Sequence, residues 1–396
     1  MARRFSRQLT PTERVYLVNA ELSPPFANQI IFEGTGEFKP EHWRKAVEVA
    51  SAANPGSRLV LKGSLCFARW TDSGKTPPVR EVDGSRWSGM DPEGAPFLAD
   101  PLPPAGPTCE VLLIHGDPLR VAFRTHHAVM DGRGTFIWAD EVFRVLRGER
   151  PAGNDSAMTE HQAARSFQKK GRVPPPHTFI APTGMPDAGA PGFTWRRIQL
   201  PGSYPDALTQ IAMVMAREAW SHRDGPVRIA VPVDLRQRVP GLRNTGNITN
   251  LVYLDITKDD TPATLARTMK RQMDERRDGE LYRGDALVRF IPLGMIRKSL
   301  IGEIARKPET GLYRNSGIIS NMGRIPAEYF SGGGFNSHSL LGVPPSIDVV
   351  PFFIGTAGLK KHLEIILSMP NALAGRGRID LLMKRLAEEM KPAVPR

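Results

Sequence analysis

The sequence predicts a mixed α/β (α+β) chain built from two lobes of comparable size. Helix-like and strand-like patterns recur in both halves, as is typical of domains that layer helices on sheets. Between Gly148 and Gly192 the apolar periodicity lapses and the composition turns to Pro, Gly, Ala and polar residues, which favours a linker or crossover. We therefore expect an N-terminal lobe over residues 1–170, a linker over residues 171–192 and a C-terminal lobe over residues 193–396.

In the first half, the clearest element is a helix from Pro40 to about Ala53. Proline is tolerated in a first helical turn, and apolar residues follow at spacings of three and four from Trp43 to Ala50. The sequence NPG at 54–56 is expected to end this helix. Similar patterns predict helices over residues 12–19 and 136–146, and strands over residues 28–33, 58–62, 66–70, 110–115 and 120–125.

The second half shows the same alternation of strands and helices. Helices are expected over residues 204–221, 262–275 and 379–390. Strands are expected over residues 193–200, 227–233, 250–256, 317–320, 349–354 and 362–368. No repeat of solenoid period is visible, so the chain does not have the pattern of a repeat protein.

Composition excludes several classes of protein. The chain has 396 residues and only two cysteines, Cys66 and Cys109, so a disulfide-stapled secreted scaffold and a zinc–thiolate module are disfavoured. No apolar run is long enough to span a bilayer, and the N-terminus lacks the apolar region of a secretory signal. We expect a cytoplasmic protein with no transmembrane segment.

The formal net charge of +12, from 53 basic and 41 acidic residues, suits an anionic partner. The basic residues are scattered, and the densest region, residues 267–307, mixes both signs without interleaved stacking aromatics. A nucleic-acid partner is therefore not expected. The phosphates of a small cofactor or an acidic carrier protein could exploit the same field, and a merely solvated basic surface also fits the count.

The segment His126-His127-Ala128-Val129-Met130-Asp131-Gly132 carries the chemical signal. The pattern HHxxxDG is expected by chance in about one in a thousand chains of this length. Neighbouring residues of an extended segment point to opposite faces, so His126 and His127 are poorly placed to ligate one metal, and no metal site is expected. One ring can instead enter a cleft, where a neutral imidazole can take a proton from an alcohol, amine or thiol.

Other catalytic signatures are missing from the sequence. It contains no GxSxG elbow, no HExxH and no GxxxxGK[ST], so a covalent serine enzyme, a zincin and a P-loop enzyme are poorly supported. Taken alone, the residues predict histidine-based proton transfer.

The motif HHAVMDG at 126–132, after a strand and before a helix, resembles the HHxxxDG motif of the CoA-dependent acyltransferase superfamily. That superfamily includes nonribosomal peptide synthetase condensation domains, wax ester synthases, alcohol acetyltransferases and polyketide-associated acyltransferases. The opening residues 9–59 are similar to the family's first helix, strand and second helix. Asp234-Leu235-Arg236 with GNITN at 246–250 resembles the family's arginine and G-x-F-x-N segment, and ISNMG at 319–323 resembles the SN-x-G segment of the alcohol and wax ester branch.

The resemblance implies two chloramphenicol-acetyltransferase-like lobes that form a pseudo-dimer around a central channel, with donor and acceptor entering from opposite ends. It implies that His127 faces the channel, as general base or as the group that stabilises the tetrahedral intermediate. It further implies that Asp131 pairs with Arg236 to hold the loop, that Gly132 permits close approach to the reacting carbonyl, and that His126 packs inside. Weaker channel candidates are Asn250, Ser320 and Asn321.

The function implied is that of a free-standing condensation-type acyltransferase. It would move an acyl group from CoA or from the phosphopantetheine of a carrier protein to a hydroxyl or amine, without an acyl-enzyme and without a permanently bound cofactor. The setting would be natural-product or lipid biosynthesis. The plant DFGWG motif is absent, which counts against that branch. A catalytically silent homologue that binds acyl-carrier proteins as a scaffold is the alternative, although such a protein has no chemical need for His127.

Overall fold

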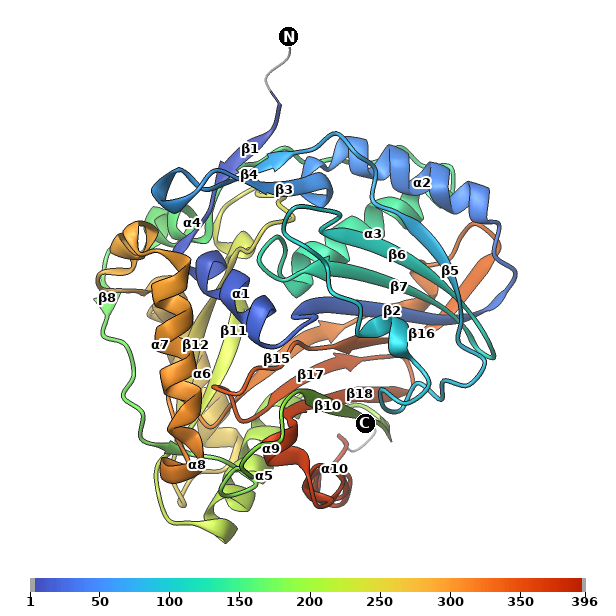
Figure 1. The fold of residues 1–396 in the computed structure, drawn as a ribbon. Coiled ribbons are helices and arrows are strands. Elements are labelled where there is room, and N and C mark those ends of the chain that lie inside the picture. The colour runs from blue at the N-terminus through green and yellow to red at the C-terminus, as the bar shows by residue number, and fades with distance from the viewer. Residues whose placement is uncertain (1–3, 394–396) are drawn as a thin grey trace.

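The computed structural model describes residues 4–393 and contains two large sheets, each covered by helices (Figure 1). The first sheet has five strands in the order β16-β2-β7-β6-β5, and only the β5–β6 pair is parallel. Helices α2 (Pro40–Ala53) and α3 (Gly132–Leu146) pack on this sheet. Its strands are β2 (Ala27–Gly36), β5 (Val79–Asp83), β6 (Cys109–His115), β7 (Leu119–His126) and β16 (Phe335–Val343).

The second sheet has six strands in the order β10-β18-β17-β15-β11-β12 and forms the core of the C-terminal lobe. Strand β15 runs parallel to both of its neighbours, and the other pairs are antiparallel. Helices α5 (Ala207–His222), α6 (Pro262–Asp274) and α10 (Arg378–Glu389) pack against it. Its strands are β10 (Phe193–Pro201), β11 (Val227–Asp234), β12 (Thr249–Ile256), β15 (Gly317–Arg324), β17 (Phe353–Gly358) and β18 (His362–Pro370).

Smaller elements complete the chain. Strands β1 (Ser6–Gln8), β4 (Arg69–Asp72) and β3 (Leu59–Lys62) form a three-stranded sheet beside α1 (Pro11–Leu22). Two short pairs join β8 (Gly171–Arg172) to β13 (Leu281–Tyr282) and β9 (Phe179–Ile180) to β14 (Leu312–Tyr313). The remaining helices are α4 (Glu160–Phe167), α7 (Leu293–Ala305), α8 (Lys307–Thr310) and α9 (Asn371–Ala374). Within residues 4–393, no helix has both the length and the apolar character needed to cross a membrane.

The two lobes are joined by an exchanged strand and by a shared apolar layer. Strand β16 comes from the second half of the sequence but pairs with β2 of the first sheet, with Leu341 opposite Ile31. Both residues belong to a buried cluster that also contains Trp195 and Ile366 from the second sheet. The first sheet is therefore buried on both faces, which explains why every residue of β2 from Ala27 to Gly34 is buried. The predicted mixed α/β class is confirmed.

Two predicted strands are wrong in position. Residues 66–70 were expected to be extended, but Leu65–Phe67 form a 3-10 turn, η2, before β4, because Gly63 and Leu65 adopt positive φ and redirect the chain. Residues 349–354 were also expected to be a strand, but β17 begins only at Phe353, after Pro351, which lacks a backbone donor for a sheet.

Several elements were missed from the sequence, among them β16, α4 and α7. Strand β16 escaped prediction because its buried positions 337 and 339 are serines, which hide the apolar alternation. Helix α4 lies inside the stretch 148–192, and its start is marked by the Thr159–Gln162 capping box, a signal that the lapse in apolar residues obscured. Helix α7 buries only Glu303, so its pattern contains no buried apolar stripe. The lobe boundaries at 170 and 193 stay predictions.

Candidate active site

The HHxxxDG segment forms the tight turn between β7 and α3. Strand β7 ends at His126, and Asp131 is the N-cap of α3, where its carboxylate accepts a hydrogen bond from the Gly134 amide at 2.6 Å. A Cβ atom on Gly134 would lie 2.0 Å from the backbone oxygen of Thr245, so the contact between α3 and the C-terminal lobe requires glycine there. The predicted order of strand, turn and helix is confirmed.

The two histidines occupy different environments, as the alternation of an extended segment predicts. His126 is fully buried, and its Nδ1 accepts a hydrogen bond from the Ala128 amide at 3.0 Å. Its Nε2 is buried without a hydrogen-bond partner in the part of the chain that the structure describes. Burial, assisted by the neighbouring His127, lowers the pKa of His126 to about 4. His126 is thus a neutral side chain inside the lobe.

His127 is half-buried and points toward α1. Its ring stacks on that of Tyr16, with centroids 4.3 Å apart and planes inclined by 28°. The Phe26 ring is also close, at a centroid distance of 5.3 Å from the imidazole. Two aromatic neighbours therefore fix the plane of the imidazole.

The hydrogen bonds of His127 set its tautomer. Nδ1 lies 3.1 Å from the backbone oxygen of Met130, which can only accept, so Nδ1 carries the proton. The Asn28 amide nitrogen lies 3.3 Å from the same atom, but it donates to the Met130 oxygen at 2.7 Å. Within residues 4–393, Nε2 has no hydrogen-bond partner, so its lone pair is free. Burial lowers the pKa of His127, and this outweighs the raising effects of the Met130 oxygen and Asp131. The ring is therefore neutral at pH 7.

Polar side chains from outside the motif hold the carbonyl groups of this turn. The backbone oxygen of His127 accepts from Asn247 Nδ2 at 2.9 Å, and that of Val129 accepts from Arg7 at 2.9 Å. With Asn28 on Met130, three elements distant in sequence fix the turn. Sequence reasoning missed Arg7, Asn28 and Tyr16, for which no pattern gave a signal. Asn247 lies in the GNITN segment, where the prediction chose Asn250 instead.

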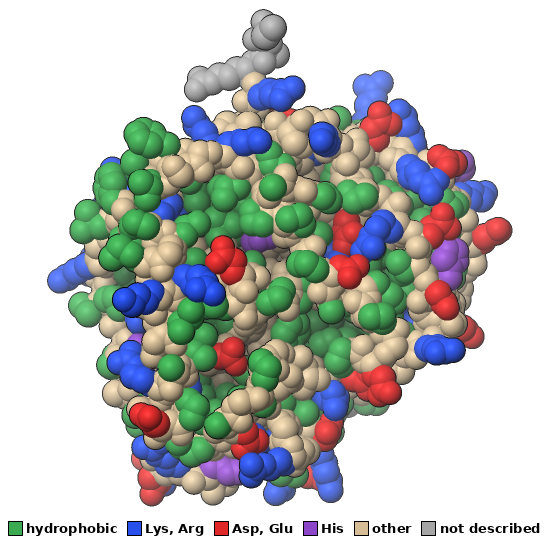
Figure 2. Space-filling model, in the orientation of Figure 1, with side chains coloured by type: hydrophobic (Ala, Val, Ile, Leu, Met, Phe, Trp, Pro, Cys, Tyr) green, Lys and Arg blue, Asp and Glu red, His purple; other side chains and the backbone are tan. Residues whose placement is uncertain are grey.

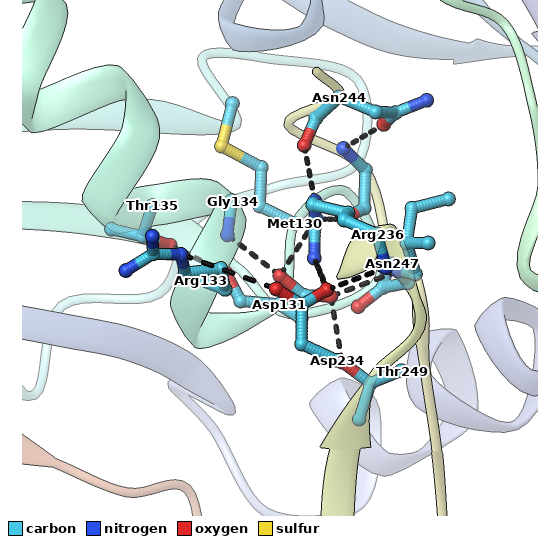
Figure 3. Close-up of polar contacts among 12 residues, drawn as sticks. Met130, Asp131, Arg133, Gly134, Thr135, Asp234, Arg236, Asn244, Asn247 and Thr249 are labelled. Atoms are coloured by element: carbon cyan, nitrogen blue, oxygen red, sulfur yellow. Dashed lines mark hydrogen bonds and ion pairs between the residues drawn. The ribbon is translucent and has the colours of Figure 1, made fainter. Parts of the chain in front are cut away.

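Asp131 does not point toward a reaction space but is enclosed by donors (Figure 3). Arg236 donates to its two carboxylate oxygens at 3.1 and 3.2 Å, so the predicted ion pair is confirmed. The Ile248 amide and the Thr249 hydroxyl each donate at 2.8 Å. Burial alone would raise the pKa of Asp131, but Arg236 and the amides of Gly134 and Ile248 hold it below its usual range. The carboxylate therefore ties the motif turn to the C-terminal lobe.

Arg236 itself is saturated by the C-terminal lobe. Its remaining N–H groups donate to the backbone oxygens of Asn244 and Gly246, both at 2.6 Å, and to the carboxylate of Asp234 at 2.8 Å. All of these contacts lie within residues 234–246, and only the contact with Asp131 reaches the other lobe. The C-terminal lobe therefore fixes the position of the guanidinium that binds the motif.

Comparison with known proteins identifies the fold. No family model and no curated protein sequence matches the chain at a significant level. Solved structures do match over nearly the whole chain. The condensation domain of the monacolin K polyketide synthase MokA gives a TM-score of 0.67 at 14% identity, covering 97% of this chain and 96% of that one.

Two further condensation-domain structures match the chain over a similar length. The starter condensation domain of rhizomide synthetase RzmA, solved with C8-CoA and Leu-SNAC, gives a TM-score of 0.65 at 15% identity, covering 97% and 93% of the two chains. The first condensation domain of the calcium-dependent antibiotic synthetase, solved with a substrate analogue, gives 0.64 at 16% identity, covering 97% and 95%. The chain has the condensation-domain fold. The two-lobe architecture described above is consistent with this fold.

Within the condensation-domain fold, the other predicted site residues lie at several places. Gly132 is the first residue of α3, and a Cβ there would meet no atom of the described chain within 4 Å. Asn250 donates to the backbone oxygens of Asp278 and Glu280 and accepts from Arg172, so its amide is used internally. It is therefore a structural side chain in this conformation.

Ser320 and Asn321 lie at the end of the regular pairing between β15 and β17. Ser320 is half-buried, and the exposed Asn321 accepts a hydrogen bond from the Gly323 amide at 2.9 Å. The ladder shifts register after Asn321. Among the described residues, neither side chain forms a hydrogen bond with His127. In those same residues, no group of three His, Cys, Asp or Glu side chains is arranged to hold a metal ion.

Proposed function

We propose that this protein is a condensation-type acyltransferase in which His127 is the general base. The proposal rests on one observation: a neutral imidazole, oriented by Met130 and Tyr16, presents an unpartnered Nε2 on the motif turn of a condensation-domain fold. The substrates would be an acyl thioester and an alcohol or amine. The products would be an ester or amide and a free thiol.

The reaction follows from the tautomer. Nε2 takes the proton of the acceptor O–H or N–H as the acceptor oxygen or nitrogen forms a bond to the thioester carbonyl carbon. The tetrahedral intermediate then collapses, the carbon–sulfur bond breaks, and the imidazolium returns the proton to the departing sulfur. The hydrogen bond from Nδ1 to the Met130 oxygen stabilises the imidazolium while it exists. No acyl-enzyme is formed.

The surrounding residues would act by positioning. Asp131 anchors the turn through Arg236, and Asn247 holds the His127 carbonyl group. The open space beside Gly132 would let the reacting carbonyl approach the start of α3, where free amide dipoles favour negative charge.

The donor is proposed to be acyl-CoA or an acyl group on a carrier protein. RzmA, which shares the fold, was crystallised with C8-CoA. The net charge of +12 favours an anionic donor through electrostatic steering, and both donors are anionic. The free thiols of Cys66 and Cys109 suit a reducing compartment such as the cytoplasm, where natural-product or lipid assembly would supply the thioesters.

Thiol release tests the proposal. Acyl-CoAs and acyl-carrier proteins are mixed with pooled alcohols and amines, and the native protein is compared with His127→Ala and with His42→Ala. His42 is an exposed histidine on α2, far from the motif in sequence, and serves as the matched control. We expect acceptor-dependent release that falls by about a hundredfold or more in His127→Ala and is unchanged in His42→Ala.

Two outcomes would contradict this assignment. Release that survives His127→Ala would place the chemistry on another residue. No release by the native protein, combined with tight binding of a carrier protein, would identify a catalytically silent scaffold. Circular dichroism of each variant excludes unfolding as the cause of a loss.

A further inference from the structure

A large apolar surface lies exposed beside α1. It consists of side chains from η2, from the 3-10 turn η6 (Asp285–Phe290) and from α7; we call it the η2–α7 surface. Phe67 is 81% exposed, Leu287 65% and Met295 63%, and the other members are Leu65, Phe290, Ile291 and Ile301. Figure 2 shows hydrophobic side chains gathered at the upper left, where these elements lie. Contiguous exposed patches of this kind mark interaction sites.

The fold holds this surface together. Arg14 of α1 is buried, and it donates to the backbone oxygen of Leu65 at 2.9 Å and to that of Ile291 at 2.5 Å. One guanidinium therefore fixes η2 against the start of α7. Leu65 adopts a φ of 49°, a conformation that leucine rarely adopts, and the turn it makes leaves Phe67 projecting into solvent.

The charges around the surface are mostly positive, although the exposed Glu21 of α1 lies 3.8 Å from Arg297 at its edge. Residues 59–69 and 281–301, which supply it, contain six basic side chains and one acidic side chain, Asp285. The basic residues are Lys62, Arg69, Arg283, Arg289, Arg297 and Lys298, and all six are exposed. The rest of the chain is more balanced, since the whole sequence has 53 basic and 41 acidic residues.

We propose that the η2–α7 surface binds bilayers that contain anionic lipids. Phe67, Phe290 and Met295 would enter the boundary between headgroups and acyl chains, while the basic side chains contact lipid phosphates. The shape favours lipid over protein. Phe67 projects as a single side chain from a turn, whereas apolar anchors between proteins need a matching pocket in the partner. A fluid bilayer accepts such projections without a pocket, and the basic rim complements its charge.

Vesicle co-sedimentation of the full chain tests this proposal independently of acyl transfer. Vesicles of pure phosphatidylcholine are compared with vesicles of equal phosphatidylcholine and phosphatidylglycerol. We expect binding to the anionic vesicles that weakens with added salt. Phe67→Asp and Met295→Asp should each lower the partition coefficient by about tenfold or more, because each removes a large apolar side chain from the bilayer. Leu381→Asp, on the exposed face of α10, is the matched control and should bind as the native protein does.

Three results would overturn the proposal. The first is native protein that stays in solution with both vesicles. The second is binding that Phe67→Asp and Met295→Asp leave intact. The third is a native dimer that these variants convert to monomers without any vesicle binding, since that would identify the surface as a contact between copies of this chain. Light scattering during size-exclusion chromatography reads the oligomeric state. All variants replace exposed side chains, so loss of folding is not expected.

Discussion

Two buried ionic contacts join the halves of this protein, and they are built differently. Around Asp131, one carboxylate is held by Arg236 together with two backbone amides and a hydroxyl. Around Arg197 of β10, one guanidinium lies between two buried carboxylates, Glu33 of β2 at 2.7 Å and Glu364 of β18 at 2.8 Å. The first contact relies on backbone donors that the fold positions, whereas the second relies on charges that neutralise one another.

This difference in construction suggests different roles: the Asp131 contact positions the motif turn, and the Arg197 contact stabilises the fold. Backbone donors around Asp131 fix the geometry of the motif turn, so changes there should affect the reaction. The Arg197 contact lies between the two sheets, and Arg197, Glu33 and Glu364 are all buried. Removing Arg197 would leave Glu33 with Arg120 as its remaining arginine and Glu364 with no arginine in the core, so changes there should affect folding.

The largest expected effect is that of Arg197→Met on stability. Breaking a buried charge contact by removing one partner costs about 3–5 kcal/mol, and urea unfolding should show a loss of this size. Arg196→Met is the matched control. It lies on the same strand but pairs with Asp380 at the surface, where such a pair contributes about 1 kcal/mol or less. Equal losses of unfolding free energy in the two variants would show that the buried contact between the sheets contributes no more than a surface ion pair.

Asp131→Asn should have a smaller effect on stability but a clear effect on rate. Asparagine still caps α3, so we expect a loss of about 1.5–3 kcal/mol from the charged hydrogen bonds to Arg236. Thiol release should fall by about tenfold or more, because the turn that carries His127 loses its anchor. In the control Asp234→Asn, Arg236 keeps its contact with Asp131, and both quantities should change less. A rate unaffected by Asp131→Asn would contradict the positioning role.

The same comparison shows what the sequence could reveal. The Asp131–Arg236 pair was predictable because both residues belong to recognisable motifs. The contact among Glu33, Arg197 and Glu364 was not, since each appears as an ordinary charged residue in a strand, and only the packing of the two sheets brings them together. Charged residues in a strand usually indicate an exposed face, which here is the wrong interpretation.

In the candidate site, too, the residues that only tertiary packing brings together could not be predicted from the sequence. The opposite environments of His126 and His127 followed from strand alternation, and the helix after the motif followed from its periodicity. Tyr16, Asn28 and Arg7 could not be found in this way, because they reach the turn from elements more than 90 residues away. Strand β16 escaped for a related reason, since its buried serines are polar in sequence but pack between the lobes.

The pH dependence of thiol release tests the ring that the Asp131 contact positions. Because burial lowers the pKa of His127 from its ordinary value, the base should be mostly neutral at pH 7. The rate should therefore rise with pH with a midpoint below about 6.5, the ordinary imidazole value. A midpoint above that value would mean that water or the substrates stabilise the imidazolium, and that the ring is not the desolvated base described here.

The smallest effect expected is on stability in acid, and it compares the carboxylates of the two contacts. The folded-state pKa of Asp131 is lowered, so its contribution to stability is present above the unfolded pKa and is lost as pH falls through the folded value. The stability difference between native protein and Asp131→Asn should thus shrink as the pH falls below about 4, the ordinary aspartate value. Glu33 also has a lowered pKa, because Arg197 and Arg120 outweigh the raising effect of burial, so Glu33→Gln should behave alike. Urea unfolding at several pH values measures both differences. If the Asp131→Asn difference stays constant as the pH falls while the Glu33→Gln difference shrinks, folding does not lower the pKa of Asp131, which would contradict the role assigned to Arg236 and the amides around it.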